Sequence, residues 1–265
     1  MQKARSSLFN FTEHLLSEGR ATFSFEEAKW SLKLSDTALR ASVRRLKEKG
    51  VLAAPIQKFF VILPPEYRVM GCLPAAHFIP DLMKYVGAKY YICLLSAGEY
   101  YGAAHQRPQV FQVMTNTPRR AIKCGRVQVT FISKGNIHET KTRYFNTPRG
   151  TISVSTPDFT AFDLVGYVKQ AGGLNNVATV LSELAESLDP LELVKAAKCS
   201  PLAWAQRLGF LLESLSVSDK TEQLAKFVAD NNPEVAGLSP FESKRGYDID
   251  SRWRIALNTD LEPDI

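Results

Sequence analysis

The segment SDTALRASVRRLKEKGVLAAPIQKFFVILPP, residues 35–65, decides the fold of the N-terminal part of the chain. Apolar side chains recur three and four positions apart in its first half, at Leu39, Val43 and Leu46. A helix turns about 100° per residue, so this spacing places the three side chains on one face, which we expect to be buried. The opposite face is small and cationic, which raises the question of what it contacts.

The ends of this helix are marked by residues that cap helices. Ser35 is a suitable N-cap, because its hydroxyl oxygen accepts a hydrogen bond from a free backbone N–H. Gly50 follows the last turn and adopts the left-handed conformation at low cost. Strand-forming residues then lie on both sides of a turn at residues 55–58, so two short strands are predicted.

Two further helices are predicted upstream. The first covers residues 7–17, where leucine and phenylalanine recur at helical spacing. The second begins with a capping box, in which the side chains of Ser24 and Glu27 each bond a backbone N–H of the other residue, and it ends near Lys33. Three helices followed by two strands are the order of a winged helix-turn-helix domain, which we predict for residues 1–64.

The outer face of the third helix has the properties of a DNA-recognition surface. Small residues such as Thr37 and Ala41 permit close approach to the major groove, and an arginine such as Arg44 can form paired hydrogen bonds with guanine. Neighbouring cations contact phosphates without reading sequence. The residues predicted to bind DNA are Ser35, Thr37, Arg40, Ala41, Arg44, Arg45, Lys47 and Lys58. For an isolated helix a merely solvated basic face is the better explanation, whereas the winged helix-turn-helix order favours DNA.

From Glu66 onward the sequence alternates between helix and strand patterns. The predicted elements are helices at residues 79–85 and 90–104 and strands at residues 110–116 and 126–132. A basic turn is predicted to join the two strands, and mainly helical patterns follow Pro157. The predicted fold class is therefore α+β: the winged helix-turn-helix domain is followed by a mixed α/β domain at residues 65–265 with a helical second half.

Composition and charge indicate a soluble protein with a polarised chain. Hydrophobic residues make up 45% and charged residues 23% of the sequence. No apolar run approaches the roughly 18–20 residues that span a bilayer, so we expect a cytoplasmic protein without a membrane partner. The net charge of +6 divides into +5 for residues 1–64, +8 for residues 65–156 and −7 for residues 157–265. The basic part is suited to nucleic acid, although charge alone identifies no partner.

The sequence carries no recognisable metal, cofactor or catalytic motif. Cys72, Cys93, Cys124 and Cys199 are far apart, so we expect reduced and mostly buried thiols. The phosphate-binding, dinucleotide-binding and nucleophile-elbow motifs are missing from the sequence. The predicted strands also lack the acidic residues of a metal-dependent nuclease. We expect a protein with no cofactor and no metal that is not an enzyme, while catalysis by the C-terminal domain stays an open alternative.

Basic residues in predicted turns form a second candidate binding surface. The predicted patch of the C-terminal domain consists of His105, Arg107, Arg119, Arg120, Lys123, Arg126 and Arg149. Such a patch can bind nucleic acid or an acidic protein surface. The alternative, which we favour, is that these side chains are solvated individually.

Acidic and aromatic residues of the same region also have two interpretations. Asp158 and Asp163 are either a metal or acid–base pair or, as we favour, parts of a helix that begins after Pro157. For the tyrosines at 90, 91, 100 and 101, packing is favoured over base stacking. The tryptophans Trp30, Trp204 and Trp253 are predicted to lie in cores.

Several stretches in order along the chain resemble one family. They are GEYYGAAHQRPQVFQVMTN, TPRRAIKCGRVQVTFISK, TPRGTISVSTPDFTAFDLVGYV, GGLNNVATVLSELAE, QRLGFLLESL and DIDSRWRIALN. The sequence is similar to AbiEi-type antitoxins of bacterial type IV toxin-antitoxin systems, which serve in abortive infection and phage defence. The resemblance covers nearly the whole chain.

The resemblance implies a protein with two roles. An N-terminal winged helix-turn-helix would repress the operon by cooperative binding to inverted repeats in its own promoter, with the DNA role carried by Thr37, Arg40, Ala41, Arg44, Arg45 and Lys58. A C-terminal domain would counter a nucleotidyltransferase-like toxin without a stable complex. We expect a monomer in solution.

Three alternatives remain open at this point. In the first, the C-terminal domain binds RNA or acts as a catalyst, and the DNA-binding module serves only as a tether. In the second, the protein binds the toxin stoichiometrically. In the third alternative the protein is a transcriptional regulator without a toxin.

Overall fold

The computed structural model describes residues 7–103 and 108–262, and the fold is a mixture of α and β, as predicted. Contacts divide the chain into two compact units. Unit 1 consists of Met1–Tyr90, Gln109–Lys134 and Tyr144–Ser153, and unit 2 consists of Tyr91–Pro108, Gly135–Arg143 and Val154–Ile265. Unit 1 thus extends beyond residue 64, where the sequence predicts the end of a DNA-binding domain.

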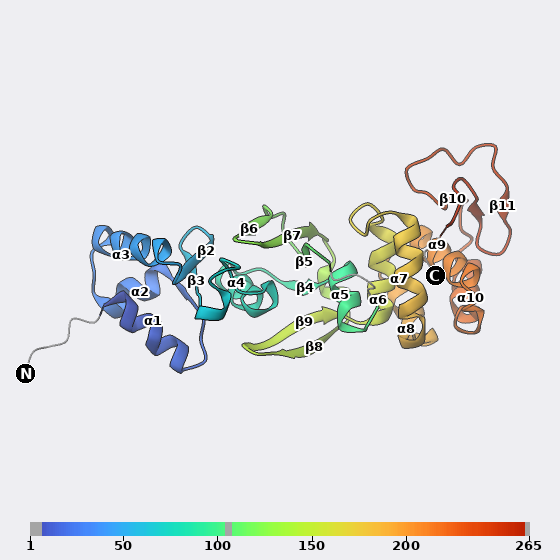
Figure 1. The fold of residues 1–265 in the computed structure, drawn as a ribbon. Coiled ribbons are helices and arrows are strands. Elements are labelled where there is room, and N and C mark those ends of the chain that lie inside the picture. The colour runs from blue at the N-terminus through green and yellow to red at the C-terminus, as the bar shows by residue number, and fades with distance from the viewer. Residues whose placement is uncertain (1–6, 104–107, 263–265) are drawn as a thin grey trace, which may run out of the picture. The chain divides into compact units, whose positions relative to one another are not determined.

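Unit 1 begins with three helices and a small sheet (Figure 1). The elements are α1 (Leu8–Ser17), β1 (Thr22–Ser24), α2 (Phe25–Leu32), α3 (Asp36–Glu48), β2 (Leu52–Ile56) and β3 (Phe59–Ile62). The predicted caps are confirmed: Ser24 and Glu27 form the reciprocal capping box of α2, and the Ser35 hydroxyl accepts the Ala38 N–H at the start of α3. Gly50, after the last turn of α3, has a φ of +65°.

The core beneath these helices matches the predicted apolar stripe. Leu39, Val43 and Leu46 of α3 are buried, as expected. The sheet has the strand order β1-β3-β2, with antiparallel pairing throughout. The prediction for Trp30 is wrong, because its side chain is 84% exposed on α2. Ala28 and Leu32 supply the buried face of that helix, and Trp30 lies between their positions on the other side.

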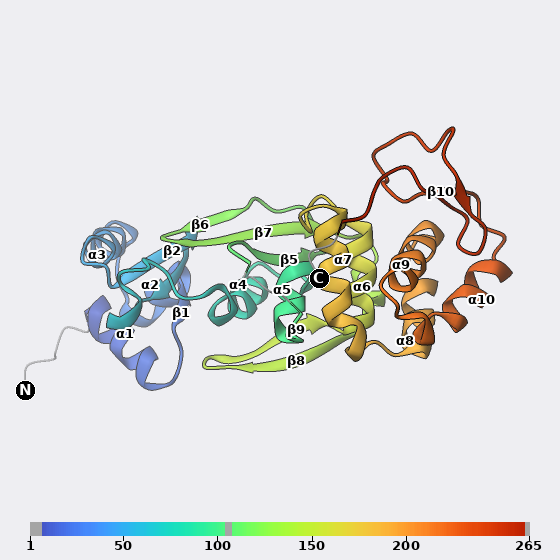
Figure 2. The same ribbon diagram turned by 45° about the vertical axis from the view of Figure 1, so that its right-hand side comes forward.

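The rest of unit 1 contains α4 (Ile79–Tyr85) and three neighbouring strands in the order β6-β7-β5 (Figure 2). The strands are β5 (Phe111–Thr115), β6 (Ile122–Cys124) and β7 (Val127–Ser133). Strands β5 and β7 are confirmed and pair in parallel, whereas β6 pairs antiparallel with β7 through a tight turn at Gly125. The predicted basic turn between β5 and β7 therefore contains a strand, because two parallel strands cannot be joined by a simple hairpin turn.

A second group of strands comes from before and after β5–β7 in the sequence. They are β4 (Tyr90–Ile92), β8 (Thr142–Thr147) and β9 (Gly150–Ser155). Strand β4 pairs in parallel with β9, where Ile92 lies opposite Val154. The helix predicted from residue 90 is wrong in its first residues. Cys93 is extended, and only α5 (Leu94–Tyr100) is helical.

Unit 2 is mainly helical, as predicted for the second half of the chain. Besides α5, its helices are α6 (Pro157–Gly166), α7 (Leu174–Leu184), α8 (Pro190–Lys198), α9 (Leu202–Ser214) and α10 (Glu222–Asp230), followed by the two-residue strands β10 (Ala236–Gly237), β11 (Ile249–Asp250) and β12 (Ile255–Ala256). Helix α10 is not among the predicted elements. Trp253 is fully buried, as predicted, and its ring packs on Gly209 of α9. Among the described residues, no helix combines the length and apolarity needed to span a bilayer.

Candidate nucleic-acid interface

The outer face of α3 is exposed along its length. Thr37, Arg40, Ala41, Arg44 and Arg45 are all exposed. They share the helix with the buried stripe, so burial of that stripe directs them away from the core. The predicted DNA-binding face is therefore accessible in the part of the chain that the structure describes.

Ser35 has a local role at this site. Its hydroxyl oxygen accepts a hydrogen bond from the Ala38 N–H at 3.3 Å. Asp36, the first residue of α3, pairs with Lys29 of α2 at 2.6 Å. The hydrogen bond from Lys29 lowers the pKa of the Asp36 carboxyl and raises the pKa of the Lys29 ammonium. The cap stabilises the first turn of α3, and the ion pair connects α3 to α2.

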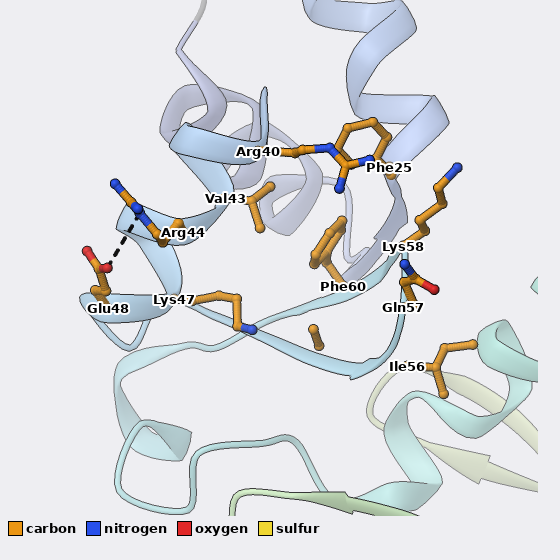
Figure 3. A pocket seen from close by; sticks show the side chains of 11 residues that line it. Phe25, Arg40, Val43, Arg44, Lys47, Glu48, Ile56, Gln57, Lys58 and Phe60 are labelled. Atoms are coloured by element: carbon orange, nitrogen blue, oxygen red, sulfur yellow. Dashed lines mark ion pairs between the residues drawn. The ribbon is translucent and has the colours of Figure 1, made fainter. Parts of the chain in front are cut away.

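A groove of about 580 Å³ lies between α3 and the β2–β3 hairpin (Figure 3). It is lined by Phe25, Arg40, Val43, Arg44, Lys47, Glu48, Ala54, Ile56, Gln57, Lys58 and Phe60. Its apolar lining comes from α2, α3 and the hairpin, and its cations come from α3 and the hairpin turn. The groove therefore combines an apolar floor with positive charge at its edge.

The hairpin turn is held against the start of α2. The Phe25 N–H donates to the Lys58 carbonyl oxygen at 2.8 Å, and Lys58 adopts a φ of +63°. The Lys58 ammonium pairs with Glu26 at 3.3 Å. Because of this backbone hydrogen bond, the turn that carries Lys58 keeps its place beside α2.

The cations of α3 make contacts that leave them accessible. The Arg40 guanidinium lies over the Phe25 ring, and Figure 3 shows the two side chains together. Arg44 pairs with Glu48 at 3.7 Å, but both side chains are more than half exposed. Such a surface pair contributes at most about 1 kcal/mol, so a phosphate group can replace the carboxylate. Arg45 donates a hydrogen bond to the Ser42 hydroxyl at 3.1 Å.

Phe25 and Phe60 are the aromatic residues of this site, and the sequence prediction did not include them. The capping box identifies Ser24 as the residue before a helix, and therefore makes Phe25 its first residue. Alternation does not show that these aromatic rings line the same groove. They line one groove because the chain returns from α3 through the hairpin.

The structure places the residues of the predicted basic patch in different surroundings. His105 and Arg107 lie outside the described residues. Arg119 and Arg120 line a second cavity of about 290 Å³ in unit 1, together with apolar residues such as Leu82 and Phe131.

The other three cations of the patch lie on different elements. Lys123 is exposed on β6, Arg126 is exposed in the following turn, and Arg149 donates to the Gly19 carbonyl oxygen at 3.4 Å. A single binding patch formed by all these residues stays a prediction.

The two carboxylates of α6 have individual hydrogen-bond partners. Asp158 lies in the first turn of α6 and accepts the Asp189 N–H at 2.9 Å, and burial raises the pKa of its carboxyl. Asp163 accepts a hydrogen bond from the Tyr91 hydroxyl at 2.8 Å, and both side chains are buried. These contacts fit the helix interpretation of Asp158 and the packing interpretation of Tyr91. Within the described residues, no group of three or more His, Cys, Asp or Glu is arranged to hold a metal ion.

A deeply buried cation also has a structural role in unit 2. Arg207 of α9 is 4% exposed and donates hydrogen bonds to the carbonyl oxygens of Val165, Gly237 and Leu238. Burial lowers the pKa of its guanidinium. The side chain connects α6 and α9 with the C-terminal strands.

Part of this chain matches a known family model. Residues 90–214 match the family model described as the AbiEi antitoxin C-terminal domain. No curated protein sequence matches the chain. The fold is similar to that of the Rv2827c protein from Mycobacterium tuberculosis, with a TM-score of 0.67 and 13% identity over 92% of this chain and 89% of that one. Residues 90–214 are therefore similar to the AbiEi antitoxin C-terminal domain, and the chain as a whole shares the fold of Rv2827c.

Proposed function

We propose that this protein is the antitoxin and transcriptional autorepressor of a type IV toxin-antitoxin operon. Its N-terminal helices and small sheet act as a winged helix-turn-helix that binds inverted repeats in its own promoter. The C-terminal domain counters a nucleotidyltransferase-like toxin. The proposal is for a cytoplasmic protein that is monomeric in solution, binds DNA cooperatively and forms no stable complex with the toxin.

The match of residues 90–214 to the antitoxin domain carries the antitoxin part of this proposal. The DNA-binding part is supported by the exposed cationic face of α3 beside the β2–β3 hairpin. In winged helix-turn-helix proteins the recognition helix enters the major groove with small and cationic residues. Thr37, Ala41 and Arg44 are suited to base contacts, and Arg40, Arg45, Lys47 and Lys58 to phosphates.

Binding to a promoter fragment with inverted repeats tests the DNA-binding part. Full-length protein should bind this fragment more tightly than a scrambled one, and the affinity should fall steeply with salt because phosphate contacts release counterions. Arg44→Ala should weaken binding to the repeats by about 1–3 kcal/mol if Arg44 reads a base. Lys226→Ala, which removes an exposed cation of α10, is the matched control for loss of one charge. Equal affinity for both fragments would contradict the proposal.

Co-expression with the toxin tests the antitoxin part. A truncation near Glu66 would cut through unit 1, so full-length variants with a disabled α3 face are preferable. Arg40→Ala combined with Arg44→Ala should abolish repression and leave toxin neutralisation intact. Loss of both activities in a folded variant would show that neutralisation requires DNA binding.

A further inference from the structure

Two cysteines from separate parts of the sequence lie together in unit 1. Cys72 follows the small N-terminal sheet, and Cys124 is the last residue of β6. Their thiols are hydrogen bonded to each other. Cys72 is fully buried and Cys124 is 8% exposed, so the pair lies just beneath the surface.

The backbone beside both cysteines is fixed by a close crossing of two glycines. A Cβ atom added to Gly125 would lie only 2.1 Å from the Met70 carbonyl oxygen and 2.8 Å from the Gly71 Cα. Gly71 and Gly125 both have positive φ values, +69° and +56°, which favour glycine. The Arg126 N–H donates to the Met70 oxygen at 2.8 Å. The two chain segments therefore meet without intervening side chains, directly beside the two thiols.

The surroundings of the two sulfur atoms differ. Cys124 accepts hydrogen bonds from the Cys72 thiol and from the Ala54 N–H of β2, and Lys47 adds a positive charge nearby; together these lower the pKa of Cys124. The pKa of Cys72 is raised by its hydrogen bond to Cys124 and by burial. Of the two thiols, Cys124 therefore has the lower pKa and ionises more readily. The thiolate is the reactive form of cysteine, so Cys124 is the nucleophile.

We propose that Cys72 and Cys124 are a peroxide-sensitive pair that closes to a reversible intramolecular disulfide. The Cys124 thiolate attacks one oxygen of hydrogen peroxide, the O–O bond breaks, and sulfenic acid and hydroxide are formed. The Cys72 sulfur then attacks the sulfenic sulfur, and the hydroxyl leaves with the thiol proton as water. The hydroxide takes up the proton that Cys124 released on ionising, so the two thiols lose two electrons in total and the peroxide is reduced to two molecules of water.

The chemistry of this site differs from the proposed DNA and toxin activities, although Lys47 and Ala54, which act on Cys124, also line the groove beside α3. This chemistry depends only on contact between the two thiols and on access of a small oxidant to Cys124. The disulfide would join the segment after β3 to β6, next to the β2 strand of the hairpin. Of the other two cysteines, Cys93 is fully buried, and Cys199 is partly exposed and serves as the background thiol.

Peptide mapping of the full-length protein tests the proposal. The protein is treated with hydrogen peroxide, quenched with an alkylating agent under denaturing conditions and digested with trypsin without reductant. Trypsin places Cys72 in the peptide 69–84 and Cys124 in the peptide 124–126, so a disulfide joins these two peptides with the loss of two hydrogen atoms. A reductant should restore both separate peptides. The Cys199→Ser variant is treated in parallel, and it should form the same joined peptide.

Variants of the pair identify the order of the two steps. Cys72→Ser should accumulate sulfenic acid at Cys124, which dimedone traps, whereas Cys124→Ser should leave Cys72 as a free thiol. The proposal is overturned if both cysteines are alkylated fully after peroxide treatment of the wild type, or if Cys199 is the main oxidised residue. The wild-type map decides even if one of the variants fails to fold.

Discussion

Arg40 of α3 lies over the ring of Phe25 of α2, with its guanidinium carbon 5.3 Å from the ring centroid. Phe25 is itself buried and lines the groove between α3 and the hairpin. The ring therefore supports a cation of the proposed DNA-binding face from below. Lys58, 5.9 Å from the same centroid, approaches this ring from the hairpin turn.

Replacing the ring should weaken DNA binding without changing the number of charges. Phe25→Leu keeps an apolar side chain but loses a cation–π interaction of about 0.5–1 kcal/mol, so affinity should fall roughly two- to fivefold. The dependence of affinity on salt should stay the same, because the same cations remain. Arg40→Ala should instead reduce the salt dependence by about one counterion if Arg40 contacts a phosphate. Fluorescence anisotropy over a salt series measures both, and an identical salt dependence in the two variants would contradict a phosphate role for Arg40.

The contact of Trp253 with α9 predicts an unusual effect of alanine in a helix. Gly209→Ala would place a Cβ 2.1 Å from the Trp253 ring, and overpacking of a buried site costs about 1–3 kcal/mol. This exceeds the gain of about 1 kcal/mol that alanine brings over glycine in a helix. Urea unfolding should therefore show a lower stability for Gly209→Ala. Gly135→Ala, where the added Cβ meets nothing within 4 Å, is the control and should change stability little. A stabilised Gly209→Ala protein would argue against this packing.

The hydrogen bond from the Asp189 N–H to Asp158 predicts different effects for two substitutions. Asp158→Ala leaves that N–H without its acceptor and should cost about 1–3 kcal/mol. Asp158→Asn keeps an acceptor oxygen and should cost less. Because burial raises the folded-state pKa of Asp158, its contribution to stability is largest below the ordinary aspartate pKa and is lost as pH rises through the folded value. The Asn variant should therefore gain stability relative to wild type between acid and neutral pH, and an equal loss in both variants at every pH would rule this account out.

Two half-buried tyrosines predict a loss of stability in alkali. Burial raises the pKa of Tyr101 and of Tyr167 to about 12, whereas an unfolded tyrosine ionises near 10. Between these values the unfolded chain releases protons that the folded protein retains, so stability falls from about pH 10 to about pH 12. Tyr167→Phe removes one of these groups and should make the fall less steep. Unfolding midpoints in urea across this range, with wild type in parallel, measure the difference; identical slopes would show that Tyr167 does not take part.

Local signals in the sequence were sufficient for some elements and insufficient for others. Helix α3 combines an apolar stripe with a cap at Ser35, and both signals depend only on neighbouring residues. Strands β1 and β6 are three residues each, too short for periodicity, and they form because distant strands supply their hydrogen-bond partners. Trp30 was misassigned because a large aromatic side chain is usually buried, whereas its position on α2 directs it outward.

The candidate site likewise contains some residues that the sequence predicts and others that come together only in the fold. The exposed cations of α3 follow from the helix pattern, because residues opposite an apolar stripe face solvent. The groove does not, since its floor joins Phe25 and Phe60, which are brought together only when the hairpin turn bonds to the start of α2. The positions of Cys72 and Cys124 in the sequence likewise do not predict their contact. It depends on two glycines that let separate segments approach closely.

The pairing of β1 with β3 has a consequence for synthesis on the ribosome. Thr22 lies opposite Val61, so the strand between the first two helices finds its partner only after the whole hairpin has been made. Until Ile62 has left the exit tunnel, nascent α1, α2 and α3 lack the sheet against which their apolar faces close. We therefore expect this part of the chain to acquire protease resistance in one step during translation, and not helix by helix.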